Sequence, residues 1–327
     1  MRIMKRFKNI LFVYSGNADA NLMALKHSLD LASINRGRLT VLTVLKELPE
    51  DWHYKVPLER YLREEVEADV KKALEDSREG SHEVTPAIEF TSGEVFIETI
   101  GKVLANDHDL VIKAVESRKD KKPLRGFLTT DMHLLRKCPC PLWLFREPKN
   151  AQAPHILAAI DPSDASPKED AMTRLILQLG SSLRERIGTA SLEVIHCWEL
   201  EYEDAMRHSP FMRISDDELQ TRLRDAETKH GAAFSAAVEE FGDRERTTVS
   251  LLKGNPTEVI PSKVRDDSVN LIVMGTVART GIKGLFIGNT AETILMDVDC
   301  SVLAVKPEGF VTPVAPATPS SNETVKA

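Results

Sequence analysis

The two halves of the chain repeat one plan of segments. The apolar segment KNILFVYSG near the N-terminus is echoed by PHILAAIDP after the midpoint, so that Ile10 pairs with Ile156. A second echo pairs DLVIKA, from Asp109, with NLIVMG, from Asn270. Self-similarity at this spacing indicates that each half forms a unit of its own on a shared plan. The sequence therefore predicts two similar domains in tandem.

Short apolar runs alternate with longer helical segments in each half. Runs such as ILFVY and LIVM are nearly continuous, which is typical of strands buried on both faces. Residues 58–77 and 216–241 carry charges at helical spacing and are too long for strands. This alternation predicts an α/β fold with a parallel sheet and crossover helices. The expected strands are 10–14, 39–44, 87–90, 110–113 and 142–145, then 156–160, 192–198, 249–252, 271–274 and 302–305.

Domain boundaries follow from the segments that lack periodicity. The linker EPKNAQAP spans residues 147–154, so the first domain is expected over residues 1–148 and the second over 153–308. Residues 309–327 end in a stretch rich in Pro, Thr, Ser and Ala, which predicts a disordered tail.

Composition excludes several classes of protein. A net charge of −7 argues against a nucleic-acid partner, because no basic footprint for a phosphate backbone is available. No apolar run is long enough for a signal peptide or a membrane span. Four scattered cysteines fit a reduced cytoplasm rather than a disulfide framework. We expect no metal site, since Cys138 and Cys140 lack the spacing and partners of a zinc motif.

The segment MGTVARTGIKGLFIGNTAETIL begins at the last residue of the expected strand 271–274. It carries four glycines before an expected helix that begins at Ala291. Glycine lets backbone N–H groups approach a ligand, and the N-terminus of a helix attracts anions. The alternative is a turn that only connects a strand to a helix. Parallel sheets bind ligands beyond the carboxyl ends of their strands. Three segments should therefore meet there, namely residues 161–164, residues 196–198 and this glycine loop.

The loop resembles the universal stress protein family, whose ATP-binding members carry Gly, two residues, Gly, nine residues, Gly and then Ser or Thr. Gly275, Ala278, Gly288 and Asn289 occupy these positions, and Thr290 follows one place later. The segments LLRKCPCP, MGTVARTGI and FIGNTAE are similar to the tandem-domain type of this family. The resemblance implies two Rossmann-like domains, of the adenine nucleotide alpha hydrolase-like class, that pack as an intramolecular pseudo-dimer. It also implies a cytoplasmic stress-response protein.

The resemblance assigns residues of the second half to an adenine nucleotide. Asp161 matches the acidic residue at the nucleoside, and Cys197 falls against the adenine ring, with His196 beside it. From the residues alone, Asp161 could equally be a turn or cap residue and Cys197 a core residue. The remaining residues assigned to the ATP site are Met274, Gly275, Ala278, Arg279, Gly288, Asn289 and Thr290.

At the phosphate end of this site, backbone N–H groups of the loop and the charges of Arg279 and Lys283 would meet the anion. Asn289 could instead act only as a helix cap. Ala278 stands where the family has its second glycine, so we expect a reduced affinity for ATP.

The first half departs from the family pattern at the same site. Ser15 stands in place of Asp161, Ala114 in place of Gly275, and Leu128 in place of Gly288. We expect that this half does not bind ATP.

The resemblance implies a function in ligand sensing, and the chain shows no nucleophile with a base. We therefore expect no enzyme, although slow ATP hydrolysis is compatible with the site. The second hypothesis is a stress-response scaffold that has lost nucleotide binding and acts through a non-nucleotide ligand or partner proteins. A homodimer through sheet edges is compatible with either hypothesis.

Overall fold

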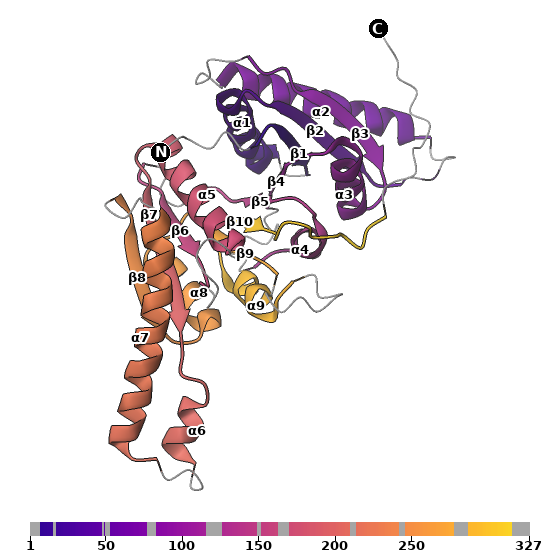
Figure 1. Cartoon of the computed structure of the whole chain (residues 1–327). Helices are drawn as coiled ribbons and strands as arrows, with labels where there is room; N and C mark the ends of the chain where they lie inside the picture. Colours follow the sequence, from indigo (N-terminus) through magenta and orange to yellow (C-terminus); the bar gives the residue numbers. More distant parts are fainter. Residues whose placement is uncertain are drawn as a thin grey trace. The chain divides into compact units, whose positions relative to one another are not determined.

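The computed structural model describes residues 7–15, 18–47, 49, 53–76, 83–115, 126–148, 152–162, 170–209, 214–241, 246–277 and 287–315. These residues divide into two compact units (Figure 1). The first unit holds the described parts of Lys5–Glu147 and Ser301–Ala327, with Ile287. The second unit holds those of Pro148–Ala278 and Gly288–Cys300.

The first unit contains six strands in the order β3-β2-β1-β4-β5-β10. Neighbouring strands from β3 to β5 are parallel, whereas β10 is antiparallel to β5. The strands are β1 (Asn9–Tyr14), β2 (Arg38–Leu45), β3 (Ala87–Ser92), β4 (Leu110–Ala114), β5 (Leu142–Phe145) and β10 (Ser301–Val305). The helices are α1 (Ala18–Asn35), α2 (Lys55–Asp76), α3 (Val95–Asn106) and α4 (Thr129–Lys137).

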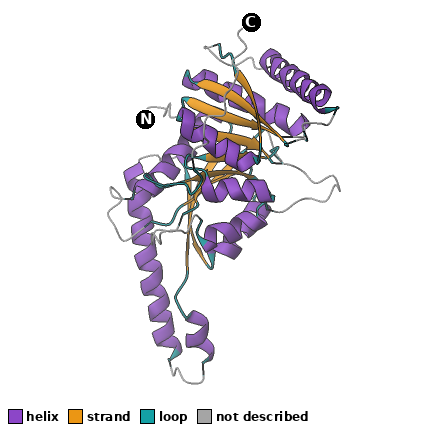
Figure 2. Ribbon diagram, turned by 90° about the vertical axis from the view of Figure 1, so that its right-hand side faces the viewer, coloured by secondary structure: helices purple, strands orange, loops and turns teal. Residues whose placement is uncertain are grey.

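The second unit repeats this arrangement with four parallel strands in the order β9-β6-β7-β8. They are β6 (His155–Ala159), β7 (Ser191–Trp198), β8 (Thr248–Lys253) and β9 (Leu271–Gly275). The helices are α5 (Ala171–Ile187), α6 (Glu203–His208), α7 (Asp216–Phe241), α8 (Pro256–Asp266) and α9 (Asn289–Asp297). Figure 2 shows strands flanked by helices.

The central strands are buried on both faces, as their continuous apolar sequences require. Ile10, Leu11, Phe12 and Val13 of β1 have no exposed surface. Burying both faces excludes water from the ladder and leaves each backbone group paired with a neighbouring strand.

The insertion between β7 and β8 is larger than its counterpart in the first unit. Figure 1 shows the short helix α6 beside the far end of the long helix α7. Trp198, Leu219 and Leu223 form a buried cluster, against which Met206 of α6 and Ile214 pack. This small core explains how a helix of 26 residues extends beyond the sheet.

The α/β class expected from the sequence is confirmed, and each of the ten strands lies within two residues of its expected position. From the sequence, each half is expected to form a parallel sheet of its own five strands. The structure differs at the last strand, because β10 pairs antiparallel with β5, with Leu303 opposite Trp143. This pairing covers the edge that β5 would otherwise leave open.

Two smaller expectations concern segment ends. Helix α9 begins at Asn289 with Gly288 as its N-cap, so the expected start at Ala291 is wrong by two residues. Of the tail predicted to be disordered, residues 309–315 are described, and the ring of Phe310 lies 4.8 Å from Nζ of Lys306. Among the helices in the described residues, none has both the length and the apolar character needed to cross a membrane.

Candidate functional site

Strand register in the second unit brings the expected nucleotide residues to one edge of the sheet. Ala159 at the end of β6 lies opposite both Ile195 of β7 and Met274 of β9. Asp161 comes two residues after Ala159, Cys197 two after Ile195, and Gly275 one after Met274. All three therefore lie at the carboxyl ends of adjacent strands. Ligands of parallel sheets bind at this edge.

The N-terminus of α9 is held at the same edge. The N–H of Gly288 donates to the carbonyl oxygen of Thr276, 2.8 Å away. The Gly288 N–H is therefore already paired in this structure, and its use for phosphate stays a prediction. Asn289 and Thr290 are exposed in the first turn of α9, where backbone N–H groups have no acceptor within the helix.

The side chain of Asn289 does not cap α9, since the helix begins at Asn289 itself. The other loop residues assigned to phosphate, Ala278 and Arg279, lie outside the described residues, as does Lys283.

Gly275 lies against helix α5 at this edge of the sheet. A Cβ at this position would lie 3.4 Å from both Cγ and Sδ of Met172 and 3.9 Å from Cδ1 of Ile176, on helix α5. These are ordinary contact distances, so alanine would fit here, as Ala114 does at the same place in the first unit. Packing against α5 therefore does not require a glycine at position 275, and the position is compatible with a bound ligand.

Asp161 follows β6 with a side chain that is 75% exposed. The N-cap of the next helix is Asp170, whose Oδ1 accepts from the N–H of Thr173 at 2.9 Å. A role for Asp161 as the cap of α5 is therefore excluded. Its carboxylate is largely exposed at this edge of the sheet.

Cys197 is partly buried next to this carboxylate. Burial, with a smaller contribution from the charge of Asp161, raises the pKa of the Cys197 thiol to about 11. A thiol with this pKa stays protonated near neutral pH and is a poor nucleophile. Cys197 can contact a ring or pack in the core, and it does not supply a thiolate for catalysis.

Three ring side chains lie next to one another near Asp161, namely those of His196, His230 and Trp198. His196 is buried, with Nδ1 3.3 Å from the carbonyl oxygen of Ile160 and 3.8 Å from Oδ1 of Asp161. Its Nε2 lies 2.9 Å from Nδ1 of His230 on α7, so one of these nitrogens donates and the other accepts. The ring of His230 also stacks on Trp198 at 6.2 Å.

Sequence reasoning placed His196 beside the site but missed His230. Strand alternation could have set His196 and Trp198 on the face of β7 opposite to Cys197. The position of a partner on the long helix α7 could not be inferred without knowing how that helix crosses the sheet.

At the matching edge of the first unit, two groups of the chain are paired with one another. Oδ1 of Asn21 accepts from the N–H of Ser15 at 3.2 Å, and the Asn21 amide donates back to the Ser15 carbonyl oxygen. In the first turn of α4, Asp131 lies 3.0 Å from Nζ of Lys113, and both side chains are 1% exposed. An anion therefore already sits at this helix N-terminus, and it belongs to the protein.

The second unit has apolar residues at these two positions. Met274 stands where β4 has Lys113, and Ala291 stands where α4 has Asp131. The positive end of α9 is therefore not neutralised by a residue at the third helical position, although Glu292 adds a negative charge at the fourth. Of the two units, the second is better suited to an external anion.

Comparison with known proteins agrees with this duplicated architecture. The universal stress protein family matches residues 6–146 and again residues 153–306. Universal stress protein E of Escherichia coli K12 is 29% identical over 221 residues, which cover 67% of each chain. The homologue from Haemophilus influenzae is 29% identical over 205 residues, covering 62% of this chain and 63% of the relative.

Solved structures share the fold across both units. A Pseudomonas aeruginosa protein of unknown function superposes with a TM-score of 0.66 and 22% identity, covering 94% of this chain and 95% of that one. A universal stress protein from Archaeoglobus fulgidus gives a TM-score of 0.58 and 16% identity, covering 91% and 98%. With the family matched twice along its length, the chain belongs to the universal stress protein family.

Proposed function

We propose that the second unit binds ATP or a related adenine nucleotide and that the protein acts as a nucleotide-dependent sensor in the stress response. The observation that carries the proposal is the convergence of Asp161, Cys197, Gly275 and the N-terminus of α9 at one sheet edge. Asp161 would accept from the ribose hydroxyls, and Cys197 would lie against the base. The first-turn N–H groups of Asn289 and Thr290 would meet the phosphates.

The first unit serves in this proposal as an internal reference. Its Lys113–Asp131 pair occupies the place where an incoming phosphate would need a free helix terminus. We therefore propose a single nucleotide per chain, bound in the second unit. A binding role without turnover is also part of the proposal. Action in the cytoplasm is the setting we propose for it.

Equilibrium binding of fluorescent ATP to the full chain tests the assignment. The double variant Met274→Lys/Ala291→Asp places the ion pair of the first unit into the second. We expect it to lower ATP affinity at least about tenfold, because the carboxylate of the introduced pair would occupy the positive end of α9 in place of phosphate. Asp161→Ser, which copies Ser15, should lower the affinity as well.

Matched substitutions in the first unit provide the control. Ser15→Ala should leave ATP binding unchanged, since the backbone of Ser15 is already paired with Asn21 and the proposed site lies in the second unit. Equal losses from Ser15→Ala and Asp161→Ser would contradict the assignment to the second unit. Absence of any ATP binding by the unmodified chain would contradict nucleotide sensing altogether.

A scaffold with a different ligand is the second candidate. It is favoured by one observation, namely that the Gly288 N–H is already used by Thr276. Mass spectrometry of small molecules released on denaturation separates the candidates. A nucleotide in the released fraction supports the first, and a different compound or none, together with no ATP binding, supports the second.

A further inference from the structure

Three side chains that can ligate a metal converge at the opposite edge of the second unit. His155 opens β6, Glu193 is the third residue of β7, and Asp267 follows α8. One ligand atom of each lies within 4.8 Å of the others. At about 3.3 Å per strand residue, His155 is roughly 20 Å from Asp161, so this cluster is separate from the nucleotide edge.

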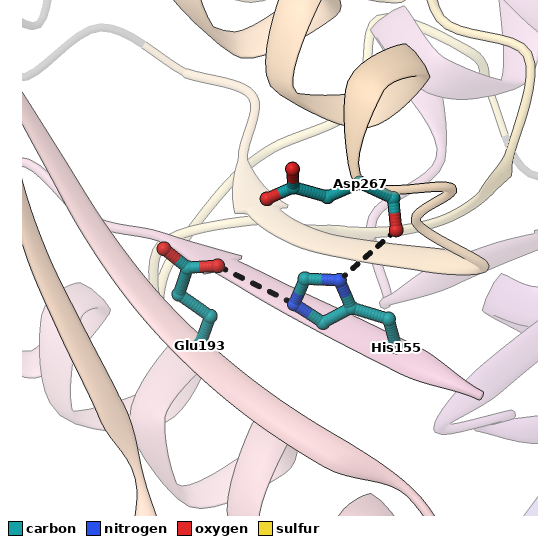
Figure 3. A group of neighbouring side chains, drawn as sticks. All are labelled: His155, Glu193 and Asp267. Atoms are coloured by element: carbon teal, nitrogen blue, oxygen red, sulfur yellow. Dashed lines mark hydrogen bonds and ion pairs between the residues drawn. The ribbon is translucent and has the colours of Figure 1, made fainter. Parts of the chain in front are cut away.

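The imidazole of His155 is oriented between a carbonyl and a carboxylate (Figure 3). Its Nδ1 lies 3.5 Å from the backbone carbonyl oxygen of Asp267, and its Nε2 lies 3.4 Å from Oε2 of Glu193. A carbonyl and a carboxylate both accept, so each ring nitrogen faces an acceptor, and a metal ion would take the place of the proton on Nε2. Metal-binding histidines are held in the same way, with one nitrogen on a carbonyl and the other toward the ion.

The repeat supports this orientation independently. At the same place in the first unit, Nδ2 of Asn9 donates to the carbonyl oxygens of Asn106 at 2.7 Å and Asp107 at 3.2 Å. The position therefore requires a donor that ties the first strand to the end of the crossover helix. Histidine meets this requirement with Nδ1 and adds a second nitrogen, which asparagine does not offer.

The acidic residue is also placed differently in the two units. In the first unit the β3 position carries Glu89, and the β2 position opposite Ala87 carries Thr40. In the second unit the corresponding residues are Ser250 and Glu193, so the acid lies on the strand next to His155. Ser250 Oγ donates to Oε1 of Glu193 at 2.6 Å, which leaves Oε2 toward the imidazole.

Lys263 is the resident cation of the cluster. Its Nζ lies 3.0 Å from Oε1 of Glu193 and 2.6 Å from Oδ2 of Asp267. Burial alone would lower the pKa of Lys263, but its hydrogen bonds and ion pairs with Asp267 and Glu193 outweigh burial and raise it. Two carboxylates still exceed one ammonium by one negative charge. The lysine stem in the last turn of α8 is flexible enough to move its charge into water.

We propose that His155, Glu193 and Asp267 form a binding site for zinc or a similar divalent transition-metal ion, which displaces the ammonium of Lys263. Zinc takes imidazole nitrogen and carboxylate oxygen at about 2.0–2.2 Å, so two donors of a tetrahedral site lie roughly 3.3–3.5 Å apart. The separation of 3.4 Å between Nε2 of His155 and Oε2 of Glu193 meets this condition. Figure 3 shows the Asp267 carboxylate above the gap between them, and its ligand oxygen lies within 4.8 Å of the other two ligand atoms.

Titration of Zn²⁺ into the full chain, in competition with a chromophoric chelator, tests the proposal. We expect one ion per chain at this site. His155→Asn keeps the donor that Asn9 supplies in the first unit but removes Nε2, and should weaken binding by about 10–100-fold. Glu193→Gln should weaken it similarly. Lys263→Gln should strengthen binding by about tenfold, because the competing ammonium is gone.

Two controls separate this site from others. His208, in an exposed pair with Asp204 at 2.9 Å, offers an unrelated histidine, and His208→Asn should leave the affinity unchanged. Co²⁺ in place of Zn²⁺ should show no thiolate-to-metal absorption, which would appear if the ion bound Cys138 and Cys140. The proposal is overturned by absence of Zn²⁺ binding, by equal binding of His155→Asn in a fold with unchanged thermal unfolding, or by a thiolate band.

Discussion

Buried lysines in the first unit show how the surroundings of one residue set its energetic role. Lys113 faces the carboxylate of Asp131 at 3.0 Å, in a pair with almost no exposed surface. Lys306 instead donates to the carbonyl oxygen of Leu135 at 2.7 Å. A buried charge is costly unless it is compensated, so the two lysines should respond differently to mutation and to pH.

The Lys113–Asp131 pair can be tested with the residues that the second unit has in the same places. Asp131→Ala alone should lower the free energy of unfolding by about 3–5 kcal/mol, because it leaves the buried ammonium uncompensated. The double variant Lys113→Met/Asp131→Ala copies Met274 and Ala291 and should regain most of this loss. Urea unfolding measures both. A double variant as unstable as the single one would contradict the account.

Lys306 should make stability depend on alkaline pH. Burial lowers the pKa of Lys306 from 10.5 to about 8, against the charge of Cys138, which raises it. Between these two values the unfolded chain binds more protons than the folded one, so the free energy of unfolding rises with pH across this window. This contribution to stability is lost as the pH falls through the pKa of Lys306 in the folded protein.

The lowering of the Lys306 pKa from 10.5 to about 8 corresponds to a rise of about 3 kcal/mol in the free energy of unfolding across this pH range. Denaturant unfolding from pH 7 to 11 should show a rise that is missing in Lys306→Met. The comparison uses the difference between the two proteins, so that groups not coupled to Lys306 cancel. Parallel pH profiles of the two proteins would show that the ammonium is not buried in this way.

At the scale of single elements, the repeat supplies pairs of helices with different ends. Helix α8 begins after Asn255, whose Oδ1 accepts from the N–H of Thr257 at 2.9 Å, with Pro256 at the first position. Helix α3 begins after Glu94, and within the described residues the side chain of Glu94 makes no capping hydrogen bond. Each N-cap follows a glycine with positive φ, Gly254 at 132° and Gly93 at 143°.

This difference predicts unequal costs for the same mutation. Asn255→Ala should lower the free energy of unfolding by about 1 kcal/mol, because a helix-end N–H loses its acceptor. Glu94→Ala should cost no more than a few tenths of that, since the Glu94 side chain provides no cap. Chemical denaturation of the two variants side by side provides the measurement. Similar losses would mean that capping does not separate these helices.

At the scale of the whole molecule, the C-terminal strand links the second half of the sequence to the first sheet. β10 lies antiparallel to β5, with Val302 opposite Leu144. The Ser301 hydroxyl accepts from the N–H of Arg146 at 2.9 Å and donates to the Arg146 carbonyl oxygen at 3.0 Å. A fragment that ends before β10 would expose the apolar edge of β5.

Residues 1–147 expressed alone should therefore self-associate through this edge. Analytical ultracentrifugation should find dimers or larger species at micromolar concentration, whereas a Leu144→Lys version of the same fragment should shift toward monomer. A fragment that stays monomeric without the lysine would contradict the importance of the edge. The same reasoning favours site variants of the full chain over separated halves for ligand studies.

The sequence predicted the strands well because their apolar runs are local signals. It also predicted Asp161 and Cys197 at a shared edge, since that follows from parallel strands alone. The pairing of β10 with β5 could not be predicted, because a short apolar strand does not encode its neighbour. His155, Glu193 and Asp267 come from separate segments, and only the register of β6 and β7 brings them together.

The position of β10 at the end of the chain has a consequence for how the protein is made. The first sheet has five of its strands once residue 145 has left the ribosome, but its sixth strand begins only at Ser301. At about 5–20 residues per second, synthesis of the intervening chain takes roughly 8–30 s. During this interval the edge of β5 is open in every nascent chain, and a crowded polysome would bring such edges together.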